Sequence, residues 1–188
     1  EPDNAEAHAA LRTLYSQAGK WNALVEVLKA ELDAVPASDT EKRVALLREM
    51  VPIYRDKLSL DVMVINTYNA ILQLLPEDAE ALASLAKTYE ALGRWNDLIQ
   101  VLSKQADGTS DKDLKVALYM RVANLWIERF ANHNQATRPL ELVFQIDPNH
   151  REALARLKDI YAKKRAWKPL FDVLRREADL ASDPTVRL

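Results

Sequence analysis

A block of about 72 residues recurs along the chain, a length in the range typical of paired helical repeats, and its clearest mark is a tryptophan followed by leucines. Trp21, Trp95 and Trp167 mark the successive copies at nearly equal spacing. The same apolar frame surrounds each tryptophan, with a leucine and a tyrosine before it and a leucine seven positions after it. A period this regular predicts a stack of structural copies, in which each copy contacts mainly its neighbours.

The apolar residues within each block have helical spacing. Between Asn4 and Ala18 they fall three and four residues apart, which places them on one face of a helix. No stretch alternates with period two for long enough to predict a strand. We therefore predict ten helices in antiparallel pairs, at residues 4–18, 21–34, 40–57, 60–74, 78–92, 95–106, 111–130, 133–146, 150–164 and 167–180.

Glycines and prolines mark points where these helices should end or bend. Gly19 and Gly93 stand at equivalent helix ends, where a left-handed residue closes the last turn. Arg165 has the same place in the third copy, so a left-handed conformation there is predicted to cost about 1 kcal/mol. Pro52 predicts a kink in the third helix, and Pro139 predicts the same distortion in the eighth helix unless that helix begins near Thr137.

The segment LASLAKTYEALGRWNDLIQVL, from Leu82 to Leu102, resembles the tetratricopeptide repeat family in its pattern of leucine, alanine, tyrosine, glycine and an aromatic residue. Each block also divides into two helix pairs of about 36 residues, close to the ~34 residues of that family. The resemblance implies an all-α fold, a right-handed α-α superhelix of five pairs, with ten helices and a truncated eleventh. We expect one array over residues 1–188, a fragment of a longer one, with units at about 1–37, 38–75, 76–110, 111–147 and 148–183.

The chain departs from the family where two helices should approach closely. The family has glycine or alanine there, whereas this chain has Arg12 in the first unit and Lys158 in the fifth. Such side chains should hold the two helices farther apart in the odd units, which predicts an alternation of wide and narrow helix pairs. The array would then be a long-period variant of the motif, whose three tryptophans fill the space as core residues. On that interpretation Trp95→Ala would cost about 3–5 kcal/mol.

Composition excludes several classes of function. The chain has 26 Lys and Arg against 28 Asp and Glu, and the two signs alternate along it, so no nucleic acid partner is expected. No apolar run is long enough to span a membrane, and the absence of an export signal at the start favours the cytoplasm. Without cysteine, a glycine-rich phosphate loop or histidines at metal-ligand spacing, the sequence predicts no enzyme, no cofactor and no metal.

The family resemblance implies a non-enzymatic scaffold that presents a curved surface to a peptide or protein partner. The alternative is a regulatory or sensor segment of a larger protein whose catalytic or DNA-binding domain lies outside this chain. In the family the first helix of each pair lines the inner curve, which gives Thr13 and Gln17 in the first unit and a set of candidate binding residues beyond it: Arg48, Arg55, Lys87, Glu90, Asn124, Asp159 and Lys163. A truncated end would leave an apolar face on the tenth helix, which predicts weak self-association.

Overall fold

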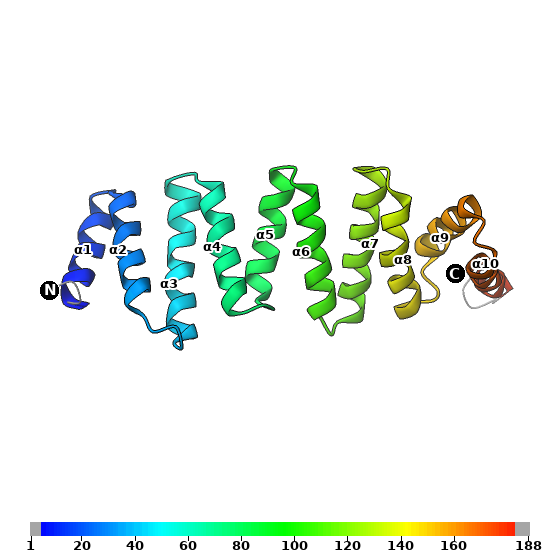
Figure 1. The fold of residues 1–188 in the computed structure, drawn as a ribbon, viewed down its shortest axis with the longest axis horizontal. Coiled ribbons are helices and arrows are strands. Elements are labelled where there is room, and N and C mark those ends of the chain that lie inside the picture. Colours follow the sequence, from blue (N-terminus) through cyan, green and yellow to red (C-terminus); the bar gives the residue numbers. More distant parts are fainter. Residues whose placement is uncertain (1–4, 183–188) are drawn as a thin grey trace. The chain divides into compact units, whose positions relative to one another are not determined.

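A computed structural model describes residues 5–182 of the chain, with side chains from residue 6 to residue 181. In this part every regular element is a helix, and consecutive helices run antiparallel (Figure 1). The elements are α1 (Ala5–Gln17), α2 (Trp21–Ala34), α3 (Thr40–Pro52), the π-helical turn η1 (Ile53–Lys57), α4 (Asp61–Leu74), α5 (Ala79–Ala91), α6 (Trp95–Gly108), α7 (Lys112–Glu128), α8 (His133–Ile146), α9 (Arg151–Lys164) and α10 (Trp167–Ser182). The predicted all-α repeat fold is confirmed, while the predicted eleventh helix lies outside the described residues.

The helices divide into two compact bodies, and the boundary falls within α5. The N-terminal body, residues 1–88, holds α1 to α4 and most of α5. The C-terminal body, residues 89–188, holds the end of α5 and α6 to α10. Within each body a helix packs against the next one along the chain, for example α2 against α3 and α6 against α7.

Each predicted helix begins within one residue of its predicted start, because local signals fix the helix ends. Asp39 and Asp111 stand one repeat apart and cap α3 and α7. The Asp39 carboxylate accepts the Lys42 N–H at 3.1 Å, and the Asp111 carboxylate accepts the Asp113 N–H at 3.0 Å. These bonds satisfy backbone donors that a helix start leaves free.

A left-handed residue closes the first helix of every pair in the described part. The five φ angles lie between 48° and 67°, at Gly19, Ser59, Gly93, Ala131 and Arg165. Two of these residues are glycines, and Arg165 was located by its equivalence to them, so the sequence identified three of the five turns. Arg165 has a φ of 55° and a ψ of 34°, which is the left-handed conformation on which the predicted cost at this position depends.

Two kinds of turn alternate along the chain. After the first helix of the odd pairs, an N–H donates to a tyrosine carbonyl five residues back, as Lys20 does to Tyr15 at 2.8 Å. After that of the even pairs, the N–H reaches six residues back, as in Leu60 to Tyr54 and Asn132 to Trp126, both at 2.8 Å. This alternation gives the double repeat a structural basis.

Arg165→Gly is expected to raise the free energy of unfolding by about 1 kcal/mol, because glycine adopts the left-handed conformation without the Cβ clash. Urea unfolding followed by circular dichroism measures the change. Gly19→Ala is the matched control and should lose about the same amount, since nothing lies within 4 Å of the added Cβ and only the backbone conformation is affected. An Arg165→Gly variant no more stable than the parent would show that the turn is not strained.

The two prolines inside helices have different outcomes. At Pro52 the α-helix ends and η1 follows, with the Leu58 N–H donating to the Ile53 carbonyl five residues back at 3.0 Å. The predicted kink is thus realised as a change from α to π register, one way in which a helix absorbs an interruption. The alternative start of α8 near Thr137 is not adopted, because the Asn132 side chain caps the helix at the predicted residue His133 and leaves Pro139 inside it.

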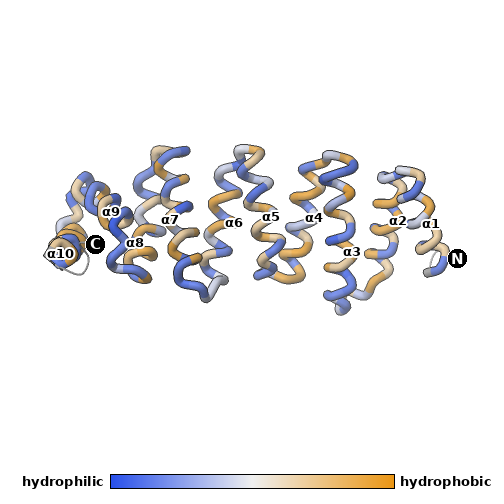
Figure 2. Tube along the Cα trace, turned by 180° about the vertical axis from the view of Figure 1, so that it is seen from behind, coloured by the Kyte–Doolittle hydropathy of each residue, from blue (hydrophilic) through white to orange (hydrophobic). Residues whose placement is uncertain are grey.

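Leucines, and not tryptophans, form the core. Among the described residues the most deeply buried leucines are 1% exposed or less, at Leu28, Leu85, Leu98, Leu102, Leu140, Leu154 and Leu157. Apolar positions recur along the helices of both bodies (Figure 2). Trp21 and Trp95 are only half-buried, and Trp167 is 66% exposed, so the prediction that the three indoles are core residues is wrong.

Candidate functional site

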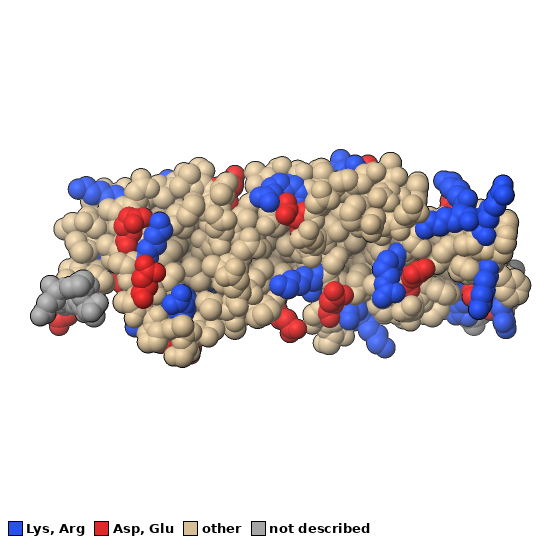
Figure 3. Space-filling view, viewed as in Figure 1, with Lys and Arg blue, Asp and Glu red and all other residues tan. Residues whose placement is uncertain are grey.

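Arginine–carboxylate ion pairs connect neighbouring first helices on the surface predicted to bind. In the N-terminal body Arg12 of α1 pairs with Glu49 of α3, and Arg48 of α3 pairs with Asp78 at 2.6 Å, just before α5. Figure 3 shows basic and acidic side chains lying beside each other over this body. In the C-terminal body Arg121 of α7 pairs with Glu90 of α5 at 2.7 Å.

Two predicted binding residues, Arg48 and Glu90, are therefore already paired with charged side chains of this chain. Arg48 also lies 3.5 Å from Glu80, so its guanidinium faces two carboxylates of this chain. Asp78 is held in turn, because its second oxygen accepts the Ala81 N–H at 2.8 Å and caps α5. Exposed pairs of this kind contribute about 0–1 kcal/mol each, so a ligand that displaced one would lose little binding free energy.

Arg55 is occupied by its neighbour in the sequence. Its guanidinium donates to both oxygens of Asp56, at 2.8 and 3.0 Å, within η1. These hydrogen bonds hold the pKa of the Asp56 carboxyl below its usual value and raise the pKa of Arg55. Arg55 and Asp56 therefore present a neutral pair to a ligand.

The other predicted residues lie on first helices but are not brought together by any contact among the described residues. Lys87 is exposed on α5, and Asp159 and Lys163 are exposed one turn apart on α9. Lys163 lines a pocket of about 440 Å³ with residues of the α7–α8 turn, among them Asn132 and His133. On α7 the Oδ1 atom of Asn124 is buried and has no hydrogen-bond partner in the described part of the chain.

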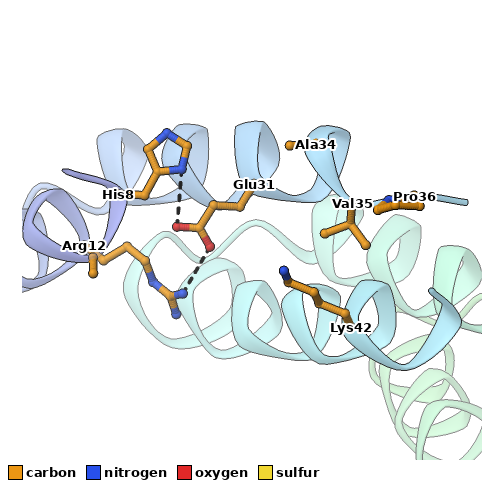
Figure 4. A pocket seen from close by; sticks show the side chains of 8 residues that line it. His8, Arg12, Glu31, Ala34, Val35, Pro36 and Lys42 are labelled. Carbon is orange, nitrogen blue, oxygen red and sulfur yellow. Dashed lines mark hydrogen bonds and ion pairs between the residues drawn. The ribbon is translucent and has the colours of Figure 1, made fainter. Parts of the chain in front are cut away.

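A pocket of about 520 Å³ opens where α1 meets the end of α2 and the start of α3 in the N-terminal body (Figure 4). His8 and Arg12 point from α1 toward Glu31 of α2, at 3.8 Å and 3.1 Å, and Lys42 of α3 lines the opposite side. Val35 and Pro36 complete the wall. We call this the Glu31 pocket.

A second pocket of about 490 Å³ lies between α1 and α3, and Arg12 lines both pockets. We call it the Gln17 groove. The α1 side of the groove is polar, with Thr13, Ser16 and Gln17, and the α3 side carries Glu49. The apolar residues of the wall are Leu24 and Leu28 of α2 and Ile53 of η1. The structure thus brings the predicted residues Thr13 and Gln17 into one groove. Sequence reasoning missed Glu31, Lys42 and the Glu31 pocket, because three helices contribute to it.

The described residues carry no group of three or more histidine, cysteine, aspartate or glutamate side chains that could hold a metal ion. None of the described helices is both long enough and apolar enough to cross a bilayer.

Two tyrosine hydroxyls of the C-terminal body donate hydrogen bonds to carboxylates, Tyr119 to Asp107 at 2.6 Å and Tyr161 to Glu141 at 2.8 Å. Burial and the hydrogen bond raise the pKa of Tyr119 to about 12, so these tyrosines serve as hydrogen-bond donors that connect helices.

Comparison with known proteins finds a family match for one stretch of the chain. Residues 81–116 match the family model described as tetratricopeptide repeat. Similar solved structures include a MamA protein (17% identity, 95% of this chain and 94% of that chain, TM-score 0.45), PilF of Pseudomonas aeruginosa (15%, 93% and 75%, 0.43) and a tetratricopeptide repeat protein from Parabacteroides merdae (20%, 96% and 66%, 0.46). A comparison with curated protein sequences found no significant match. In the length of its helix pairs and in the match at residues 81–116, the chain is similar to tetratricopeptide repeat proteins.

Proposed function

We propose that the protein is a non-enzymatic scaffold that binds an extended segment of a partner protein along its first helices. The observation that carries this proposal is the Gln17 groove, where polar side chains of α1 stand beside apolar side chains of α2 and η1. Peptide sites commonly combine an apolar surface with a few polar groups that fix orientation. The groove therefore suits a segment with an apolar side chain and a free backbone.

The side chains around the groove define what such a segment should contain. Leu24 and Leu28 form the floor of the groove and are 7% and 1% exposed, so an apolar anchor would meet only a small apolar surface there. The Gln17 amide can both donate to a backbone carbonyl and accept from a backbone N–H. Arg12 and Glu49 are the two charged residues that line the groove, and they pair with each other, so their charges cancel. We expect a ligand whose apolar anchor is flanked by uncharged residues.

A continuation of the binding surface in the C-terminal body is part of the same proposal. Asn124 has an acceptor atom that lacks a donor among the described residues, and a peptide N–H is a suitable donor after rotation of the amide.

The division into five units of one array stays a prediction, as does the regulatory alternative, which depends on sequence outside this chain.

The test is selection of binding peptides from a random display library on the full chain, followed by affinity measurement with a groove-filling variant. Thr13→Trp places a large side chain in the groove from an exposed position and should weaken binding by about tenfold or more. Asn66→Trp is the matched control, because Asn66 is exposed on α4 and lines neither pocket. Selected peptides that bind the parent and the Thr13→Trp variant equally well would remove the groove from the proposal.

A further inference from the structure

A cation stacks on the repeat tryptophan in both bodies. In the N-terminal body the Lys57 ammonium lies 5.1 Å from the centre of the Trp21 ring. In the C-terminal body the Arg129 guanidinium lies 4.4 Å from the centre of the Trp95 ring. Lys57 and Arg129 stand one repeat apart, so this indole–cation contact follows the repeat. Such contacts contribute about 0.5–1 kcal/mol at exposed sites.

Both cations come from the helix pair that follows the tryptophan-bearing helix. Lys57 ends η1, which packs against α2 together with α3, and Arg129 follows directly after α7, which packs against α6. The incoming pair therefore makes two kinds of contact: its apolar side chains cover the helix before it, and its cation covers the indole.

The corresponding face of α10 is uncovered among the described residues. Trp167, Phe171 and Leu174 are 66%, 64% and 44% exposed. The equivalent residues of α6 are a half-buried Trp95, Ile99 at 6% and Leu102 at 1%. On α2 they are a half-buried Trp21, Val25 at 3% and Leu28 at 1%. The helix face that is buried on α2 and α6 is thus exposed on α10.

No cation of the described residues stacks on Trp167. Each observed cation follows its tryptophan by about half a repeat. Asp179 also repeats Asp107, the carboxylate that accepts the Tyr119 hydroxyl of α7. The face of α10 therefore carries the three features that α6 presents to α7: an indole, an apolar stripe and a carboxylate.

We propose that this face of α10 docks a helix pair of the same kind as α7 and α8. Its first helix covers Phe171 and Leu174, and a lysine or arginine at the end of that helix stacks on Trp167. Asp179 accepts a hydroxyl hydrogen bond from the same helix, as Asp107 does from Tyr119. This surface is separate from the Gln17 groove, so the inference does not depend on the peptide-binding proposal.

The experiment supplies such a pair and measures each side chain separately. A second copy of residues 112–148 is attached after Asp183, which stands one repeat after the cap residue Asp111. Hydroxyl-radical footprinting with mass spectrometry then compares the extended chain with the native chain. The oxidation rates of Trp167 and Phe171 are expected to fall, that of Trp167 to the rate of Trp95 in the same sample. Within the copy, replacing the arginine that corresponds to Arg129 with methionine should raise the oxidation rate of Trp167 and leave Phe171 protected.

Two controls keep the result decisive. An extension with the same residues in scrambled order should protect neither Trp167 nor Phe171. In the native chain, Arg129→Met should raise the oxidation rate of Trp95, which tests the precedent without any added segment. Unchanged Trp167 and Phe171 rates beside a folded extension, or an unchanged Trp95 rate in Arg129→Met, would overturn the proposal. So would Trp167 protection in the native chain that disappears on dilution, because a second copy would then be the occupant.

Discussion

Leu98→Ala is expected to lower the free energy of unfolding by about 2–5 kcal/mol, the usual cost of removing a fully buried leucine and leaving a cavity. Leu98 is 0% exposed in the first turn of α6, in the C-terminal body. Trp95→Ala, three residues earlier on the same helix, is expected to cost only about 1–2 kcal/mol, because the Trp95 ring is half-buried and shares its face with Arg129.

Urea unfolding of both variants measures the difference, with hydrogen exchange of α6 and α7 as a control for local unfolding. The exchange control is needed because repeat proteins can lose all-or-none behaviour. A Trp95→Ala variant as destabilised as Leu98→Ala would contradict the burial order and restore the indole as a core anchor.

The misplaced tryptophans show what a repeat period can and cannot predict. A period states which residues are equivalent, and it located the helices and their first residues well. The period does not state how deeply each of these residues is buried. Trp21, Trp95 and Trp167 are the first residues of α2, α6 and α10, so they lie at the ends of helices, near the turns. The leucines three and seven positions later lie further inside the helices, and those of α2 and α6 are at most 7% exposed.

The binding surface was predictable in its helices and not in its contacts. Arg48 and Glu90 do lie on first helices, as the family resemblance implies. Their partners Asp78 and Arg121 belong to the next helix pair, and a sequence without a structure offers many carboxylates and arginines at such separations. Pairing depends on how adjacent helices are offset, which local spacing does not fix. For the same reason the Glu31 pocket could not be predicted.

The α7–α8 pair bears on the predicted alternation of wide and narrow helix pairs. Ala123 of α7 and Ala136 of α8 are both 0% exposed, and the contact between these two helices is the most extensive among the described pairs. The equivalent of Ala136 in the other pairs is larger, at Leu24, Val64, Leu98 and Leu170. Small residues on both helices allow close approach, which supports narrower packing in this pair.

Ala136→Leu is therefore expected to lower the free energy of unfolding by about 3 kcal/mol, although three other pairs have leucine at this position. The added carbon atoms have no space between closely packed helices, so side chains or backbone must shift. Urea unfolding measures the loss. Ala83→Leu on the exposed face of α5 is the matched control, expected to stay within about 0.5 kcal/mol of the parent. If Ala136→Leu is as stable as that control, α7 and α8 can separate freely, and the spacing of a pair is not set by these alanines.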